Sequence, residues 1–489
     1  MAFQSYEFIF VFMPVVAVIY FMFDRHHKAG NIFLLACSIL FYGLYGLEAL
    51  PVLFASVLIN YLFGLLLTRY KNNKSILFFG LAFNILLLCF YKYTGFLIDN
   101  INYLTGANFS IPALQNLVIP AGVSFFTITQ IVFLVDCYQG VTSEKNILEY
   151  ALFVTFFPHI LSGPIYQHKN IAKQLRDPEL HKTNWENIAK GITLFAIGMA
   201  KKVIIADSFS KYVAQAFENS FGLTLIEAWL AAICFTIQLY FDFSGYSDMA
   251  VGIAQIFNIK IPVNFNSPYK AYGIIEFWSR WHISLTNTIT NYIYTPIVMS
   301  FKKITFAKAM FATFLAMLIA GVWHGAGWTF IIFGALHGVG LVLNHVWKKY
   351  KLFMWRPLGY LLTGLLILVA NVFFRAESVK NALEVFYAML GMNGVSILES
   401  IEGTSSMRLA RITQKFAELV GLNYEPALSL LRFTPTLILG LGIIFLFPNS
   451  NKIVNKLKIS CMSIISIILL VIISCYFLDN NVEFVYFQF

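Results

Sequence analysis

The stretch FAKAMFATFLAMLIAGV (306–322), WHGAGW (323–328), TFIIFGALHGVGLVLNHV (329–346) places a short glycine-containing break between two apolar runs. Each run approaches the roughly 20 apolar residues with which an α-helix crosses a bilayer. A histidine, His324, lies at the junction of the first run and the break. The stretch predicts two membrane helices with a polar group held between them.

Apolar runs of this kind recur along the whole chain. The other candidate membrane segments are Phe8–Phe23, Ile32–Tyr45, Leu53–Leu67, Ile76–Ile98, Val118–Val135, Ile192–Ile205, Leu225–Phe241, Leu358–Phe374, Thr434–Phe447 and Ile459–Phe477. We expect an all-α polytopic membrane protein with about 11–13 transmembrane helices and re-entrant segments. Residues 1–489 are expected to form one integral membrane domain, in which 376–431 is an extracytoplasmic loop or cap.

The composition excludes other classes of protein. The chain is 59% hydrophobic and 12% charged, with a mean hydropathy of +0.72, whereas soluble chains carry about 25% charged residues. A net charge of +10 fits basic cytoplasmic loops beside anionic lipid, so no nucleic-acid partner is expected. The six cysteines show no metal-binding spacing, and no metal site is expected.

Basic residues also predict the orientation of the chain. Arg25 and Lys28 follow the first apolar run, and several lysines lie between 167 and 190, so both loops are expected in the cytoplasm. Lys452 and Lys456 precede the last apolar run, and acidic residues follow it. Both termini are therefore expected outside the cytoplasm.

Ionisable residues within so apolar a chain are costly, which makes them candidates for function. His324 is flanked by Gly325 and Gly327, which permit close approach of the backbone, and an imidazole suits acid–base chemistry near pH 7. The alternative is a buried structural histidine. His337 lies thirteen residues further on, about 20 Å away along a continuous helix, so we expect a structural role for it.

A second polar cluster, residues 264–285, is too polar to face lipid and is expected to form a re-entrant or interfacial segment. Glu276 and Arg280 have the i,i+4 spacing of an ordinary helical ion pair. His282 has no such simple explanation, and it is the functional candidate in this segment.

A third cluster, residues 238–248, is expected at the end of the apolar helix that begins at Leu225. Asp242 either orients a histidine or a cation, or it caps a helix beginning near Ser244; both possibilities stay open. The side chains that we expect to line a substrate tunnel are Trp323, Trp281, Arg280, Tyr240, Asp242, Ser244 and Asn266.

Several motifs are absent from the sequence. It has no phosphate-binding GxxxxGK[ST] loop, no GxGxxG, no HExxH and no GxSxG. An ATP-driven pump and an α/β-hydrolase are therefore disfavoured. A lipid or acyl transporter remains the alternative to an enzyme, although paired broken helices in matching halves are not evident.

The Trp323-His324-Gly325 motif with His337-Gly338 downstream, and the block from Glu276 to His282, resemble the membrane-bound O-acyltransferase superfamily. The resemblance is greatest to its bacterial branch, which includes alginate and peptidoglycan O-acetyltransferases and the membrane enzymes of teichoic-acid D-alanylation. Further motifs that carry it are Val123-Ser124-Phe125-Phe126, Phe156-Phe157-Pro158, Ser162-Gly163-Pro164, Asp242-Phe243-Ser244-Gly245 and Phe373-Phe374-Arg375. One departure is His159, where similar sequences often have glutamine.

This resemblance implies a ring of membrane helices around a tunnel in the inner membrane. It implies an acyl thioester such as acetyl-CoA as the donor substrate, with no bound cofactor. By motif, His324 would be the catalytic base and His282 its companion. The implied product is an O-acetylated cell-envelope polysaccharide, peptidoglycan first, with alginate or another exopolysaccharide, or D-alanylated teichoic acid, as alternatives. The implied partner is an extracytoplasmic SGNH-type O-acetyltransferase.

The last six residues, Phe484 to Phe489, form an aromatic tail that contains Tyr486. A similar tail occurs on a small partner protein of the teichoic-acid system, where the tyrosine is thought to carry the acyl group. This resemblance makes Tyr486 a candidate acyl carrier. The alternative is an aromatic anchor at the membrane interface.

Overall fold

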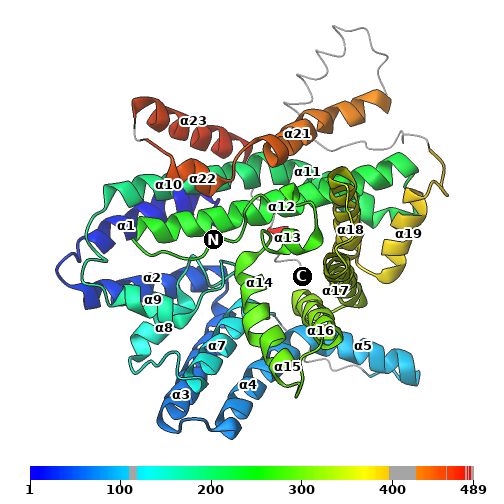
Figure 1. The fold of residues 1–489 in the computed structure, drawn as a ribbon. Coiled ribbons are helices and arrows are strands. Elements are labelled where there is room, and N and C mark those ends of the chain that lie inside the picture. The colour runs from blue at the N-terminus through cyan, green and yellow to red at the C-terminus, as the bar shows by residue number, and fades with distance from the viewer. Residues whose placement is uncertain (110–117, 396–425, 459, 479–481, 483, 486–489) are drawn as a thin grey trace.

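The computed structural model describes residues 1–109, 118–395, 426–458, 460–478, 482 and 484–485, and helices dominate its architecture (Figure 1). Seven helices in this part of the chain are long and apolar enough to cross a membrane: His27–Tyr45, Leu47–Arg69, Lys74–Thr105, Leu225–Ile256, Phe306–His324, Trp328–Lys349 and Arg356–Arg375. Shorter apolar helices cover Phe8–Phe21, Val123–Tyr138, Pro435–Leu446 and Cys461–Phe477. The protein is thus an all-α multi-pass membrane protein, as the sequence predicts.

The labelled elements follow the chain in order. The first half contains α1 (Met13–Phe21), α2 (His27–Tyr45), α3 (Leu50–Arg69), α4 (Lys74–Leu88), α5 (Thr94–Thr105), α7 (Val123–Tyr138), α8 (Ile147–Thr155), α9 (His168–Leu175), α10 (Trp185–Ala200) and α11 (Asp207–Glu218). The second half contains α12 (Leu225–Ile256), α13 (Ile274–Trp278), α14 (Ile283–Ile289), α15 (Thr295–Met299), α16 (Phe306–His324), α17 (Trp328–Lys349), α18 (Arg356–Arg375), α19 (Val379–Met389), α21 (Pro426–Leu446), α22 (Ser450–Asn455) and α23 (Cys461–Phe477).

Helix α12 runs through the middle of the molecule, with α10, α11 and α18 packed against it (Figure 1). It begins at a capping box, in which Thr224 and Glu227 satisfy each other's backbone N–H groups. The prediction that this helix ends near Phe241 was wrong, since it continues to Ile256. The polar residues from 242 to 248 lie inside a buried helix, so Asp242 does not cap a new one.

Glycines allow α12 to approach α10 closely. A Cβ atom on Gly245 would lie 2.6 Å from the carbonyl oxygen of Gly198, and one on Gly252 would lie 2.6 Å from that of Gly191. Because backbone atoms cannot move aside, only glycine fits at these crossings. The expected span Ile192–Ile205 is helical, but α10 is followed by a π-helical segment, η4 (Lys201–Ala206), that brings two lysines into the protein.

The predicted break between residues 323 and 328 is confirmed. Helices α16 and α17 fold back on each other as a hairpin. Gly321 of α16 meets the backbone of Phe330 and Gly334 in α17, so the two helices pack in close contact.

The second polar cluster forms short pieces rather than a spanning helix. Helices α13, α14 and α15 have five, seven and five residues, and they are too short to cross a bilayer. The predicted polar block 376–431 begins with α19 and ends in the first residues of α21, while 396–425 lie outside the described residues.

Candidate active site

His324 is the last residue of α16, and its side chain points into the protein. The residue is 6% exposed, and its ring packs edge-on against Phe333 of α17 and Phe374 of α18, with ring centroids 5.8 and 5.4 Å away. Gly325 then leaves the helix in an extended conformation, where a Cβ atom would overlap the ring of Phe330. The glycine after the histidine is therefore required by packing.

His324 lines a small cavity of about 20 Å³. Residues of α12, α13, α16, α17 and α18 form its wall. Among its other lining residues are Tyr269, Trp278, Trp281, Phe333, His337 and Phe374. The volume suffices for a water-sized group. Of the tunnel candidates, Trp281 thus lines the same cavity as the predicted catalytic residue His324.

His337 is closer to His324 than the sequence suggested. The separation of about 20 Å assumed a continuous helix, but the hairpin turns α17 back, and both histidines line the same cavity with Phe333 between them. The ring of His337 accepts a hydrogen bond from Trp278 Nε1, 3.3 Å from its Nδ1. This contact fits the structural role that the sequence predicts for His337.

His282 lies between α13 and α14 in the left-handed backbone conformation, with φ of 41°. Asn264 fixes this turn: its carbonyl accepts from the N–H of Ile283 at 3.0 Å, and its side-chain oxygen accepts from the N–H of Ser284 at 3.2 Å. The buried imidazole packs edge-on against Phe243 of α12, 4.7 Å between centroids. Trp281, which precedes His282 in the chain, lines the cavity around His324, so the fold brings the segments of both predicted histidines together.

Asp242 is fully buried in α12 and forms an ion pair with Lys202 of η4, at 2.8 Å between Oδ1 and Nζ. The same ammonium group lies 2.6 Å from Asp207 Oδ1. The cation that Asp242 orients is therefore a lysine of the chain. A charge buried to this degree is tolerated because two carboxylates compensate it.

The second carboxylate oxygen of Asp242 binds the C-terminal tail. Oδ2 accepts a hydrogen bond of 2.8 Å from the backbone N–H of Val485, and Phe484 stacks on Tyr246 with centroids 4.6 Å apart. Phe3 stacks on the same tyrosine at 5.0 Å. Both ends of the chain thus converge on α12, and a second cavity of about 60 Å³ lies there, lined in part by Phe3, Lys202, Tyr246 and Phe484.

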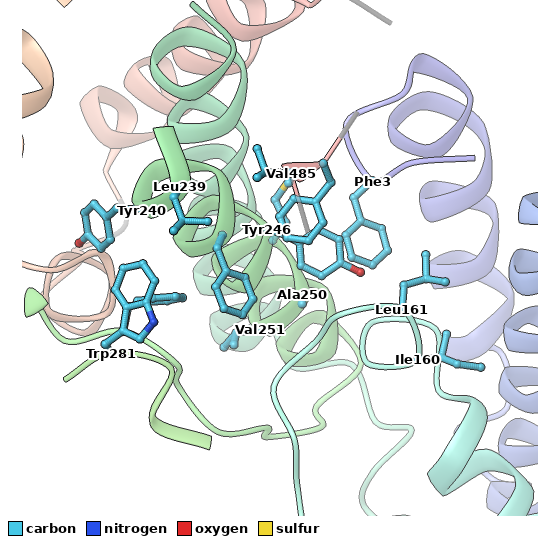
Figure 2. Packing of buried hydrophobic residues seen from close by; sticks show 14 of the residues in the cluster. Phe3, Ile160, Leu161, Leu239, Tyr240, Tyr246, Ala250, Val251, Trp281 and Val485 are labelled. Atoms are coloured by element: carbon cyan, nitrogen blue, oxygen red, sulfur yellow. The ribbon is translucent and has the colours of Figure 1, made fainter. Parts of the chain in front are cut away.

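Helix α12 separates these two places. Figure 2 shows Tyr240 and Trp281 on one side of the helix and Phe3 and Val485 on the other. Phe243 contacts both sides, since its ring lies 4.7 Å from that of His282 and 6.1 Å from that of Phe484.

The remaining tunnel candidates fall into different environments. Tyr240 packs edge-on against Tyr269 and at a tilt against Trp281, and both of these residues line the cavity. Trp323 points away from it and packs with Phe125 in a separate small cluster. The hydroxyl of Ser244 is buried in α12 with no hydrogen-bond partner in the described part of the chain.

Arg280 and Asn266 are partly exposed instead. Arg280 forms the predicted i,i+4 ion pair with Glu276, 2.6 Å between Nη2 and Oε1, and is partly exposed. The Asn266 N–H donates to the carbonyl of Arg280 at 2.9 Å, and its side chain contacts Asn449. Neither side chain is among the residues that line the cavity around His324.

His159, the departure from the usual glutamine, is accommodated by two contacts. Its Nε2 lies 3.1 Å from Thr129 Oγ1, and its Nδ1 lies 3.0 Å from the carbonyl of Pro164. Both ring nitrogens therefore lie within hydrogen-bond distance of a polar group in the core.

Sequence reasoning missed two lysines, Lys202 and Lys92. Lys92 lies in a π-helical segment, η3 (Cys89–Tyr93), and its ammonium group donates to the carbonyls of Trp323 and His324 at 3.0 and 2.6 Å. Each lysine interrupts an apolar run, and that is the signal by which both are detectable. Tyr486 lies outside the described residues. Within the described ranges, no group of three or more His, Cys, Asp or Glu side chains is arranged to hold a metal ion.

Comparison with known proteins identifies the class to which this fold and site belong. Residues 114–376 match the membrane-bound O-acyltransferase family, and this range contains His282, His324 and the whole of α12. The chain belongs to this family. It is therefore an acyltransferase, and the predicted resemblance is confirmed.

Relatives within the family are similar over most of the chain. A peptidoglycan O-acetyltransferase of Helicobacter pylori is 34% identical over 100% of this chain and 97% of its own length. A Pseudomonas aeruginosa protein named "Probable alginate O-acetylase AlgI" is 35% identical over 80% of this chain and 75% of its own length. A teichoic acid D-alanyltransferase of Bacillus subtilis is 29% identical over 52% of this chain and 66% of its own length.

Proposed function

We propose that this acyltransferase moves an acetyl group from acetyl-CoA in the cytoplasm across the inner membrane, for O-acetylation of peptidoglycan. The similarity to the Helicobacter pylori protein extends over the full length of both chains. The similarity to the alginate O-acetylase leaves a fifth of this chain unmatched, and that to the D-alanyltransferase leaves about half. Extent of similarity thus favours peptidoglycan over the two alternative acceptors.

In the proposed reaction His324 is the general base. Its imidazole removes the proton of an acceptor hydroxyl, and the oxygen then bonds to the carbonyl carbon of the thioester. The carbon–sulfur bond breaks, and the proton held by His324 passes to the leaving thiolate. An oxygen ester and free coenzyme A result, which balances atoms and charge. His282, which follows Trp281 of the cavity wall, is the companion that orients the reacting groups.

The hydroxyl that we assign as first acceptor is that of Tyr486. The observation that carries this assignment is the burial of the two residues before it. Val485 donates to the buried carboxylate of Asp242, and Phe484 stacks on Tyr246; each is 4% exposed. Tyr486 is the next residue in the sequence. A tail buried this way supports a carrier that works inside the protein, and in this proposal the tail moves from its site on α12 to the cavity of His324 on the other side of that helix.

The alternative for this tail is an aromatic anchor in the lipid headgroup region. Anchors of that kind keep an aromatic ring at the boundary between lipid and water. Phe484 instead packs among Phe243, Tyr246 and the N-terminal segment. Its burial favours the carrier.

The acetyl group then leaves Tyr486 on the extracytoplasmic side, where both termini are placed in this proposal. An SGNH-type O-acetyltransferase takes it there by transesterification and passes it to the glycan. The convergence of Phe3 and Phe484 on Tyr246 supports a common side for the two ends of the chain.

The test is intact-mass analysis of the C-terminal peptide after membranes containing the protein are incubated with acetyl-CoA. We expect one added acetyl group on Tyr486, which hydroxylamine removes because it is an ester. Tyr486→Phe is expected to abolish both the adduct and glycan acetylation. Tyr476→Phe, a change of an exposed tyrosine in α23, is the matched control and should leave both intact.

Full glycan acetylation by Tyr486→Phe, together with no adduct in the wild-type protein, would show that the tail is not a carrier. Replacement of acetyl-CoA by a D-alanyl thioester distinguishes the acyl groups. Analysis of the muropeptides against the exopolysaccharide of the same cells distinguishes the acceptors.

A further inference from the structure

The segment from α4 to α5, Lys74–Thr105, is called the arm below. It contacts the last turn of α16, the helix that ends at His324. Three consecutive carbonyls at the end of α16 accept hydrogen bonds from this arm. Lys92 Nζ donates to those of Trp323 and His324, and Tyr93 Oη donates to that of Val322 at 2.5 Å. More than 220 residues of sequence separate donors from acceptors.

The last carbonyls of an α-helix have no partner within the helix and carry a partial negative charge. A lysine ammonium group is a suitable cap for them, because it is positive and has three N–H donors. Gly325 extends the chain away immediately after His324. The arm therefore provides at this end the donors that a continued helix would have supplied.

A lysine within an apolar membrane helix needs a strong reason to be there. In the described part of the chain no carboxylate forms an ion pair with Lys92, unlike Lys201 and Lys202. The π-helical segment η3, which ends at Tyr93, turns both donors toward α16. Such segments occur frequently at functional sites.

The arm also contacts the start of α17. Asn100 of α5 accepts a hydrogen bond from Trp328 Nε1 at 2.9 Å, and Phe96 packs edge-on against the same tryptophan. In Figure 1, α5 lies beside α16 at the lower right. The loop 323–328 is thus held from both of its ends by one neighbouring element.

We propose that Lys92 is a positioning residue for the acyl transfer: by binding the carbonyls of Trp323 and His324 it fixes the imidazole of His324 in the cavity. This inference rests on the proposed function, in which His324 is the general base. Lys92 itself does not touch the substrate. A displacement of about 1 Å at a catalytic group costs up to a hundredfold in rate, so loss of this cap affects turnover directly.

The experiment measures coenzyme A release from acetyl-CoA in proteoliposomes for Lys92→Met, Lys92→Arg and His324→Ala. We expect Lys92→Met to lower kcat at least about tenfold, with KM for acetyl-CoA within about twofold of wild type. Lys92→Arg, which keeps the charge and the donors, should recover most of kcat. Lys74→Met, at the exposed start of α4 in the same arm, is the matched control and should behave as wild type.

A kcat for Lys92→Met within about twofold of wild type, with His324→Ala inactive, would overturn this inference alone. A wild-type kcat for His324→Ala would instead overturn the proposed base. A raised KM with unchanged kcat would make Lys92 a donor-binding group, which also contradicts the inference. If Lys92→Met does not fold, Lys92→Gln, which keeps an NH2 donor group without the charge, provides the same comparison.

Discussion

Lys202 Nζ lies 2.8 Å from Asp242 Oδ1 in the interior of the protein. The other oxygen of this carboxylate accepts a hydrogen bond from the backbone N–H of Val485. One ion pair therefore joins three parts of the chain: η4, α12 and the C-terminal tail. Breaking a buried pair on one side leaves an uncompensated charge, at a cost of about 3–5 kcal/mol. Asp207 stays beside Lys202 and reduces this cost.

Asp242→Ala is expected to release the tail and to lower the melting temperature in detergent, by the equivalent of about 3 kcal/mol. Limited proteolysis of the C-terminal residues followed by mass spectrometry measures the release. Asp248→Ala is the matched control, since it removes the Lys201–Asp248 pair between the same two elements, 2.6 Å long, without touching the tail. Equal protection of the tail in both variants and in the wild type would contradict its anchoring by Asp242.

His324→Ala is expected to lower kcat for acyl transfer by at least about a hundredfold, because general bases contribute roughly 10²–10⁴-fold to rate. Binding of acetyl-CoA, measured by equilibrium dialysis, should be preserved. His345→Ala, a change in the same hairpin away from the cavity, should retain activity. A transporter would not depend on an imidazole base, so full transport of acetyl groups by His324→Ala would support that alternative.

Gly245→Ala is expected to destabilise the protein by about 1–3 kcal/mol, since its added methyl group would overlap the backbone of α10 and force the two helices apart. Gly364→Ala in α18 is the matched control, because a Cβ atom there meets nothing within 4 Å. Thermal melting of both variants in the same detergent gives the comparison. Equal melting temperatures would show that α10 and α12 do not depend on this contact.

Stability is expected to fall in mild acid because of His181, which packs against Tyr20 at 4.5 Å between ring centroids. Burial, and then the charge of His27, lower the pKa of His181 to about 4. An unfolded histidine has a pKa of about 6.5, so the unfolded state binds more protons between these two values. Stability is thus full above about pH 6.5 and decreases as the pH falls toward 4.

His181→Phe is expected to flatten this part of the pH profile, measured as melting temperature between pH 7 and pH 4. His26→Gln changes an exposed histidine nearby and should leave the profile as it is in the wild type. An unchanged slope in His181→Phe would mean that another group is responsible.

The apolar runs and the motifs around the two histidines were enough to predict the membrane fold, the helical break at 323–328 and the family. These features are local. An apolar run of about 20 residues has the length of a membrane-spanning helix. A glycine next to a histidine permits the backbone to leave the helix and to approach its neighbours closely at that point. The pairing of Glu276 with Arg280 was likewise predictable, because both lie on one turn of one helix.

Contacts between distant segments were not predictable from single runs. The position of His337 beside His324 required the hairpin, since a continuous helix would have kept the two apart. The interior place of Asp242 required Lys202, 40 positions away in the sequence, as its partner. Arg280 and Asn266 lie in the same polar cluster, residues 264–285, as His282, yet both are partly exposed while the imidazole of His282 is buried.

By itself, the sequence determined that this chain lies in a membrane and that His282 and His324 are its candidates for catalysis, because hydropathy and the cost of a buried ionisable group are properties of single segments. Only the tertiary structure decided that α12 is one continuous buried helix, that the tail binds Asp242 and that Lys92 caps the helix of His324. Each of these features depends on a charge, a hydrogen bond or a packing contact between two segments that lie far apart in the sequence.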